Sequence, residues 1–167
     1  MLAHYANVFW ELIRTPFLHV ELVWGIVPLY FGWLVNELTS NKASARTALN
    51  TGFSFLWSAA HWLYQLSGAR PAKAPQITLD LLLAVNVAVT LIVAAVGLVA
   101  LVSGLRKKFP PGGSFLGHAR FSNYFMIAIF PIQANYLGWS WARAIAILLF
   151  AVPLWLFCHF GLAPFRK

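Results

Sequence analysis

The uncharged run from Leu81 to Leu105 is the sequence feature that most constrains the fold of this chain. It contains no charged residue and no proline, and Arg106, Lys107 and Lys108 follow it directly. A helix of this length rises about 37 Å, more than the roughly 30 Å of a bilayer's hydrocarbon core. Backbone groups in lipid must be hydrogen-bonded within the segment, and the run lacks the alternation of a barrel strand. The run therefore predicts a transmembrane α-helix.

Composition is typical of an integral membrane protein. Hydrophobic residues make up 60% of the chain and charged residues 10%, against about 25% charged residues in soluble domains. The net charge of +8 comes from lysines and arginines that separate apolar segments. This distribution indicates membrane topology and argues against a nucleic-acid partner. The single cysteine, Cys158, excludes an internal disulfide and a cysteine-rich metal site.

Five apolar segments predict an all-α, polytopic bundle of five transmembrane helices in a single domain over residues 1–167. The predicted spans are about 17–35, 47–66, 78–105, 121–137 and 141–160. The fourth is the weakest, because Asn123, Pro131, Gln133 and Asn135 interrupt it. Four spans plus a re-entrant fourth segment are therefore the alternative.

A short amphipathic segment precedes the first span. Residues Tyr5 to Ile13 interleave apolar and polar side chains, and Thr15-Pro16 follows them. This pattern predicts a short N-terminal helix that lies in the membrane interface and is stopped by the Thr-Pro pair.

Basic residues favour five spans over four and orient them. With five spans, one side of the membrane holds Lys42, Arg46, Arg106, Lys107, Lys108, Arg120, Arg166 and Lys167, and the other holds Arg14, Arg70, Lys73 and Arg143. A re-entrant fourth segment would move Arg143 and the tail across and make the two groups nearly equal. Because basic loops stay in the cytoplasm, we expect a multi-pass cell-membrane protein with its N-terminus outside and its C-terminus cytoplasmic.

A polar stripe on the second predicted span is the sharpest pattern in the sequence. Its members recur at steps of three or four residues and are Asn50, Ser54, Ser58, His61 and Gln65. They therefore share one face of an α-helix. Because polar groups are costly against lipid, the stripe should face other helices or a wet cavity. It is either a set of inter-helix hydrogen bonds or a seam for a solute, ion or proton.

Glu21 is the second candidate site residue, since an acid within a span is a functional-site hypothesis by default. The five-span topology places Glu21 and His61 near the same end of neighbouring antiparallel helices, so we expect them to pair. Glu37 lies at a span end and is interpreted as a boundary residue.

Small residues recur on one face of the third predicted span. Ala94, Gly97, Ala100 and Gly104 leave little bulk there, and such spacing lets helix backbones approach closely. We interpret this face as a packing seam that makes the closest helix contact in the protein.

No catalytic or metal-binding motif can be assembled from neighbouring residues. The five histidines are scattered without the HxxxH or HExxH spacing, so neither a metal nor a cofactor is expected. Three functions remain. The first is a non-catalytic subunit or scaffold of a membrane assembly. The second is a small permease or channel that uses the polar stripe. The third is a lipid-processing enzyme with His118 and Arg120 near the headgroups. The expected partners are the lipid bilayer and a second copy or other membrane subunits.

Overall fold

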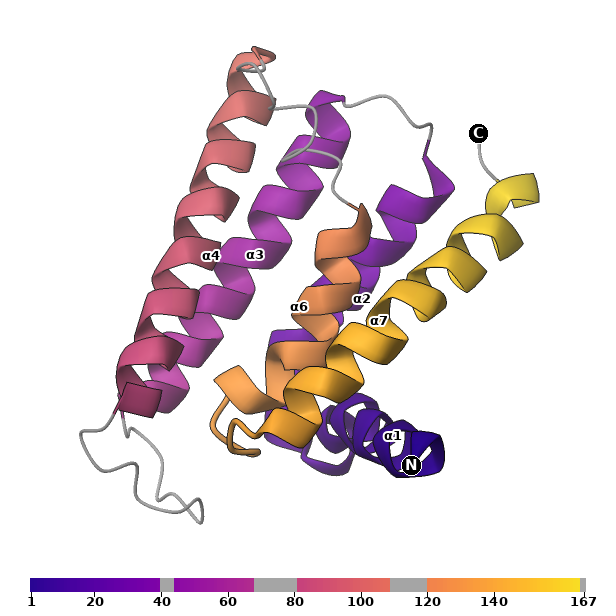
Figure 1. Ribbon diagram of the computed structural model, residues 1–167. Helices are drawn as coiled ribbons and strands as arrows, with labels where there is room; N and C mark the ends of the chain where they lie inside the picture. Colours follow the sequence, from indigo (N-terminus) through magenta and orange to yellow (C-terminus); the bar gives the residue numbers. More distant parts are fainter. Residues whose placement is uncertain (40–43, 68–80, 109–119, 166–167) are drawn as a thin grey trace.

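The described part of the chain is entirely helical. The computed structural model describes residues 1–39, 44–67, 81–108 and 120–165 (Figure 1). Its elements are α1 (Leu2–Leu18), α2 (Val20–Leu38), α3 (Ala45–Leu66), α4 (Leu81–Arg106), α6 (Arg120–Gln133), α7 (Trp141–Gly161) and the 3-10 helix η1 (Ala163–Phe165). The all-α class is therefore confirmed for these residues.

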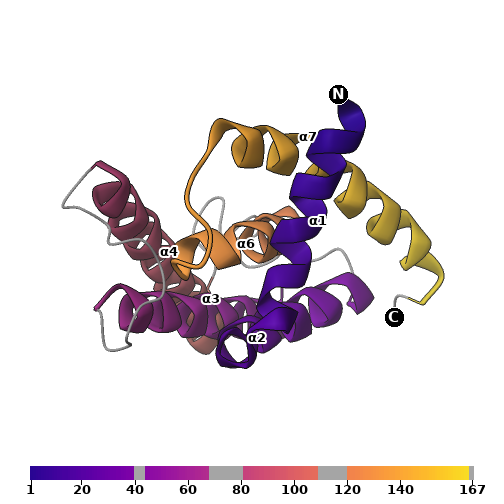
Figure 2. The same ribbon diagram turned by 90° about the horizontal axis from the view of Figure 1, so that it is seen from below.

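Five of the helices form one bundle. Figure 1 shows α2, α3, α4, α6 and α7 running side by side, each roughly opposite in direction to the one before it. Helix α1 meets α2 at an angle of 110° and lies across one end of the bundle, as the view from below shows (Figure 2). The described residues therefore form a bundle of alternating helices that is closed at one end by α1.

The N-terminal helix is longer than the sequence predicts. The expected stop at Thr15-Pro16 is wrong, because both residues lie inside α1. Pro16 removes a single backbone donor, and the Thr15 hydroxyl donates to the Glu11 carbonyl 2.6 Å away. The chain instead bends at His19, whose φ of −125° and ψ of 98° are extended. As a result Phe17 and Leu18, predicted to begin the first span, belong to α1.

Helices α3 and α4 approach each other through glycines. A Cβ atom on Gly97 would lie 3.0 Å from Cβ of Phe55 and 3.1 Å from the amide nitrogen of Leu56. One on Gly52 would lie 2.6 Å from the amide nitrogen of Leu101. A Cβ on Gly104 would likewise lie 3.0 Å from the amide nitrogen of Leu49. The two backbones are thus in contact along α4.

Helix α6 lies at the centre of the bundle. Every residue from Met126 to Ala134 is buried, and α6 packs against α1, α2 and α7. Asn135 has a φ of 60°, and the amides of Asn135 and Tyr136 bond back to the carbonyls of Ile132 and Pro131 at 3.0 Å. This left-handed cap ends the helix. The helix ends at Gln133, one turn before the end of the predicted span at 137, because the cap closes it there.

The five-span prediction is not confirmed. By length and composition, two helices can cross a membrane, Leu83–Arg106 and Trp141–Gly161, and a third span results if the bent pair α1 and α2 counts as one. Helix α6 has 14 residues, or about 21 Å, which is shorter than a hydrocarbon core. Helix α3 is long enough, but its polar residues lower its hydropathy. Two to three spans and membrane association are what the described residues support.

Gly97→Leu should destabilise the protein. The larger side chain would overlap Phe55 and the α3 backbone, and overpacking of this kind costs about 1–3 kcal/mol. The measurement is thermal unfolding of the purified protein in detergent. Gly138→Ala is the matched control, because nothing lies within 4 Å of a Cβ built there. Equal midpoints for the two variants would show that the α3–α4 contact is loose.

Candidate functional site

The polar stripe of α3 faces the backbone of α2. The Asn50 amide donates to the Gly32 carbonyl at 3.0 Å. The Ser54 hydroxyl lies 2.9 Å from the Pro28 carbonyl and 2.8 Å from the carbonyl of Asn50, and its proton is shared between them. One turn further on, the Ser58 hydroxyl donates to the Ser54 carbonyl of its own helix at 2.9 Å and lies 3.5 Å from the Gly25 carbonyl of α2. Asn50 and Ser54 therefore bond successive turns of α2, and Ser58 contacts a third turn.

Pro28 explains why α2 needs donors from outside. Proline has no N–H, so the Trp24 carbonyl one turn earlier has no helical donor. The indole N–H of Trp57 donates to this carbonyl at 2.7 Å. An unbonded carbonyl is costly inside lipid. Trp57 therefore repairs the hydrogen bond that Pro28 removes.

Glycines on α2 allow these contacts. Gly25 and Gly32 are buried, and a Cβ on Gly25 would lie 2.6 Å from Cγ of His61. A Cβ on Gly32 would overlap the Ser54 hydroxyl. Any larger residue at either position would push α3 away from the carbonyls it bonds.

The contact continues to the C-terminal end of α2 through Asn36. Its amide donates to the Thr51 hydroxyl at 3.0 Å, and its side-chain oxygen lies 3.4 Å from the Asn50 amide. Sequence reasoning missed Asn36, Thr51 and Trp57. The signal for Trp57 was present in Pro28, since a proline inside a predicted span implies an unbonded carbonyl four residues earlier.

The remaining stripe residues, His61 and Gln65 of α3, lie beside the N-terminal half of α2. Nε2 of His61 lies 3.3 Å from Nε2 of Gln65, and the His61 ring stacks on Phe130 with centroids 5.6 Å apart. The Glu21 carboxylate accepts a short hydrogen bond from the Tyr136 hydroxyl. His61 packs against Gly25, one turn from Glu21. The pairing of Glu21 with His61 stays a prediction.

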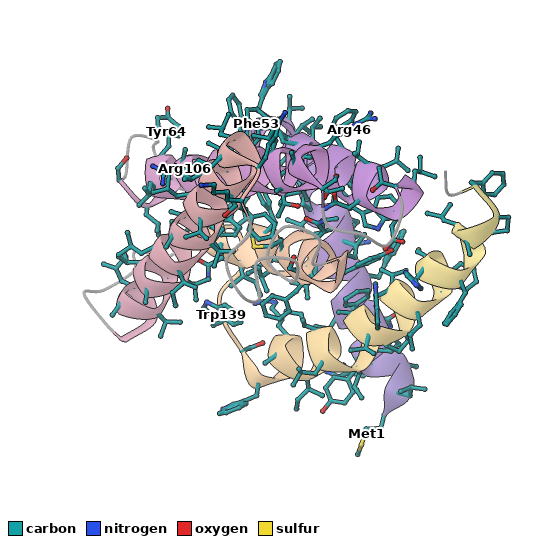
Figure 3. All side chains as sticks on the ribbon, turned by 90° about the horizontal axis from the view of Figure 1, so that it is seen from above. Met1, Arg46, Phe53, Tyr64, Arg106 and Trp139 are labelled. Atoms are coloured by element: carbon teal, nitrogen blue, oxygen red, sulfur yellow. The ribbon has the colours of Figure 1, made fainter. Side chains whose placement is uncertain are left out.

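A second polar cluster joins α4 to the end of α6. Asn86 Oδ1 accepts from the Trp139 indole at 2.7 Å and from the Gln133 amide at 3.3 Å. The Thr90 hydroxyl donates to the Asn86 carbonyl at 2.7 Å. Trp139 is labelled in Figure 3. The polar side chains of this cluster therefore hydrogen-bond to one another.

Glu37 is a buried residue and not the boundary residue that its position suggests. Its side chain has an exposed fraction of 0%, although it is the last residue but one of α2. Nδ1 of His159 on α7 lies 3.5 Å from its Oε2 atom. Tyr124 of α6 lies beside the pair and packs edge-on against Trp33, with ring centroids 5.8 Å apart. A carboxylate is thus enclosed between α2, α6 and α7.

The other predicted site residues fall in different places. Gly97 and Gly104 face α3, Ala100 is buried, and Ala94 packs against the core. His118 lies outside the described residues, as does the side chain of Arg120. Within the described ranges, no group of three His, Cys, Asp or Glu side chains could hold a metal ion.

No protein-family model, no curated protein and no solved structure matches this chain significantly. Function is therefore inferred from the geometry of the chain itself.

Trp57→Phe should destabilise α2. The variant keeps the ring but loses the N–H that bonds the Trp24 carbonyl, a loss of about 0.6–1.7 kcal/mol for a hydrogen bond between membrane helices. In a Pro28→Ala background, the new backbone N–H can serve the same carbonyl, so the loss should be smaller. Thermal unfolding of the four proteins of this cycle measures both effects. An equal loss in both backgrounds would contradict the repair.

Proposed function

We propose that this protein is a small integral membrane helical bundle that acts as a non-catalytic subunit or scaffold of a membrane assembly. The observation that carries the proposal is the bonding of Asn50 and Ser54 to backbone carbonyls of α2. A hydroxyl or amide proton that is donated to a backbone carbonyl is not available to hydrogen-bond a passing anion or neutral solute. A carbonyl also has no proton to pass on, so the seam is poorly suited to proton conduction.

The outer surface offers apolar faces that lipid or other helices can cover. Large apolar side chains are exposed on α4 at Leu91, Ile92 and Leu98, and on α7 at Leu148 and Phe157. Figure 3 labels Phe53 and Tyr64, which are exposed on α3. Such faces suit the bilayer, a second copy of the chain or other membrane subunits.

The same proposal includes a topology of five crossing segments. The alternation of α2, α3, α4, α6 and α7 in Figure 1 supports it, and so does the excess of basic residues on one side. The short α6 supports the alternative of four spans plus a re-entrant segment. We favour five segments, with the N-terminus outside and the C-terminus in the cytoplasm of a cell-membrane protein.

The proposed topology predicts that Ser114 and Lys167 lie on the same side of the membrane. Single cysteines at these positions, in a Cys158→Ser background, should react with an impermeant thiol reagent from the cytoplasmic side alone. Sealed vesicles of both orientations supply the measurement. Labelling of the two positions from opposite faces would contradict five segments.

A small permease or channel is the second candidate. Helix α2 carries a carboxylate near each end, Glu21 and Glu37, and acids within membrane helices are typical of ion or proton pathways. The third hypothesis, a lipid-processing enzyme with His118 and Arg120, concerns residues whose side chains are not described.

Flux and assembly measurements separate the two candidates. Liposomes with the purified protein should show no more proton or alkali-cation flux than empty liposomes, and native electrophoresis of gently solubilised membranes should show a complex larger than the monomer. Ser54→Ala should lower the melting temperature because its bond to α2 is lost. A saturable flux that His61→Ala abolishes would contradict the scaffold, and so would a monomer in native membranes.

A further inference from the structure

The second half of α7 is held far less firmly than the first half. Ala146, Ile147 and Ala151 are its buried residues, and no residue of α7 beyond Ala151 is buried. Pro153 lies inside the helix, so the Leu149 carbonyl lacks its helical donor. Prolines at such positions are the usual sites of helix kinks. The helix can therefore bend where its packing ends.

Polar contacts attach this second half to the rest of the bundle. His159 pairs with Glu37 of α2 at 3.5 Å, and Cys158 lies beside the Tyr124 hydroxyl of α6. The His159 side chain has an exposed fraction of 21%, whereas that of Glu37 is 0%. The histidine thus covers the carboxylate from the outside.

Apolar contacts attach this segment in part only. Leu154, Leu156, Phe157 and Phe160 are exposed, whereas Trp155 is half-buried, and η1 beyond the segment contacts α2. Lipid tails solvate exposed apolar side chains as well as another helix does, so association inside a membrane depends on packing and polar contacts. Loss of the Glu37–His159 contact would therefore weaken the hold on this segment.

The closed arrangement also buries polar atoms whose hydrogen bonds are poorly formed. The indole N–H of Trp33 and the hydroxyl of Tyr124 are buried and lie beside each other, but among the described residues neither makes a hydrogen bond of normal geometry. Burial of a poorly bonded polar group costs free energy. Entry of water beside them would recover part of that cost and would favour an open state.

We propose that residues 154–161 form an arm that swings about Pro153, and that the Glu37–His159 contact latches it against α2. Release of the arm exposes Glu37 and Tyr124 to the side of the membrane on which α7 ends. The inference is independent of the assembly proposed above, because every contact in it lies within one chain.

Cys158 is a native reporter of the arm, since it faces Tyr124 when the latch is closed. In detergent, Glu37→Gln should make the reaction of Cys158 with N-ethylmaleimide about tenfold faster, the factor that corresponds to 1.4 kcal/mol. Glu11→Gln is the matched control, because Glu11 pairs with Arg143 near the start of α7 at the same distance of 3.5 Å. Its rate should equal that of the wild type.

Two further variants keep the test decisive. His159→Gln breaks the pair from the other side and replaces Glu37→Gln if that variant does not fold. Pro153→Ala restores a donor for the Leu149 carbonyl, so in either latch variant it should slow the labelling again. Wild-type rates in the latch variants would overturn the latch. Acceleration in Glu11→Gln, or no effect of Pro153→Ala, would overturn the local, hinged motion.

Discussion

The rest of the structure depends on how α2 satisfies its backbone around Pro28. A membrane offers no water to a carbonyl that has lost its helical donor, so another part of the protein must supply one. The Trp57 indole does this for Trp24, and the stripe of α3 adds bonds to the Pro28 and Gly32 carbonyls on the next two turns. Gly25 and Gly32 let α3 come close enough. These hydrogen bonds together fix the position of α3 along α2.

The rest of the bundle follows from this contact because α3 has two different faces. Its polar face bonds α2, and its small-residue face at Gly52 meets Gly97 of α4. Phe130 of α6 then fills the space beside His61 and Trp62. Asn50 and Ser54, two of the polar residues that suggested a pathway for solutes, hold α3 against α2. This use supports a scaffold and leaves less for transport chemistry.

Sequence alone was sufficient where one local rule dominates. The charge-free run predicts a long helix, and steps of three and four place Asn50, Ser54 and Ser58 on one face. Sequence alone was insufficient where contacts between residues far apart in the chain determine the structure. Helix α1 continues through Pro16, because the loss of one backbone donor is tolerable near the end of a helix. The helix ends instead at His19, whose backbone is extended. The burial of Glu37 depends on His159, which lies far away in sequence, and no helical spacing relates the two.

The central claim is that the α2–α3 seam is dry and structural, and thiol accessibility at Ser54 tests it most directly. In a Cys158→Ser background, Ser54→Cys should stay unreactive toward a small, water-soluble methanethiosulfonate applied from both sides of the membrane. Trp10→Cys, at an exposed position of α1, should react under the same conditions. Rapid modification of Ser54→Cys in the folded protein would place water along the stripe and would contradict the account.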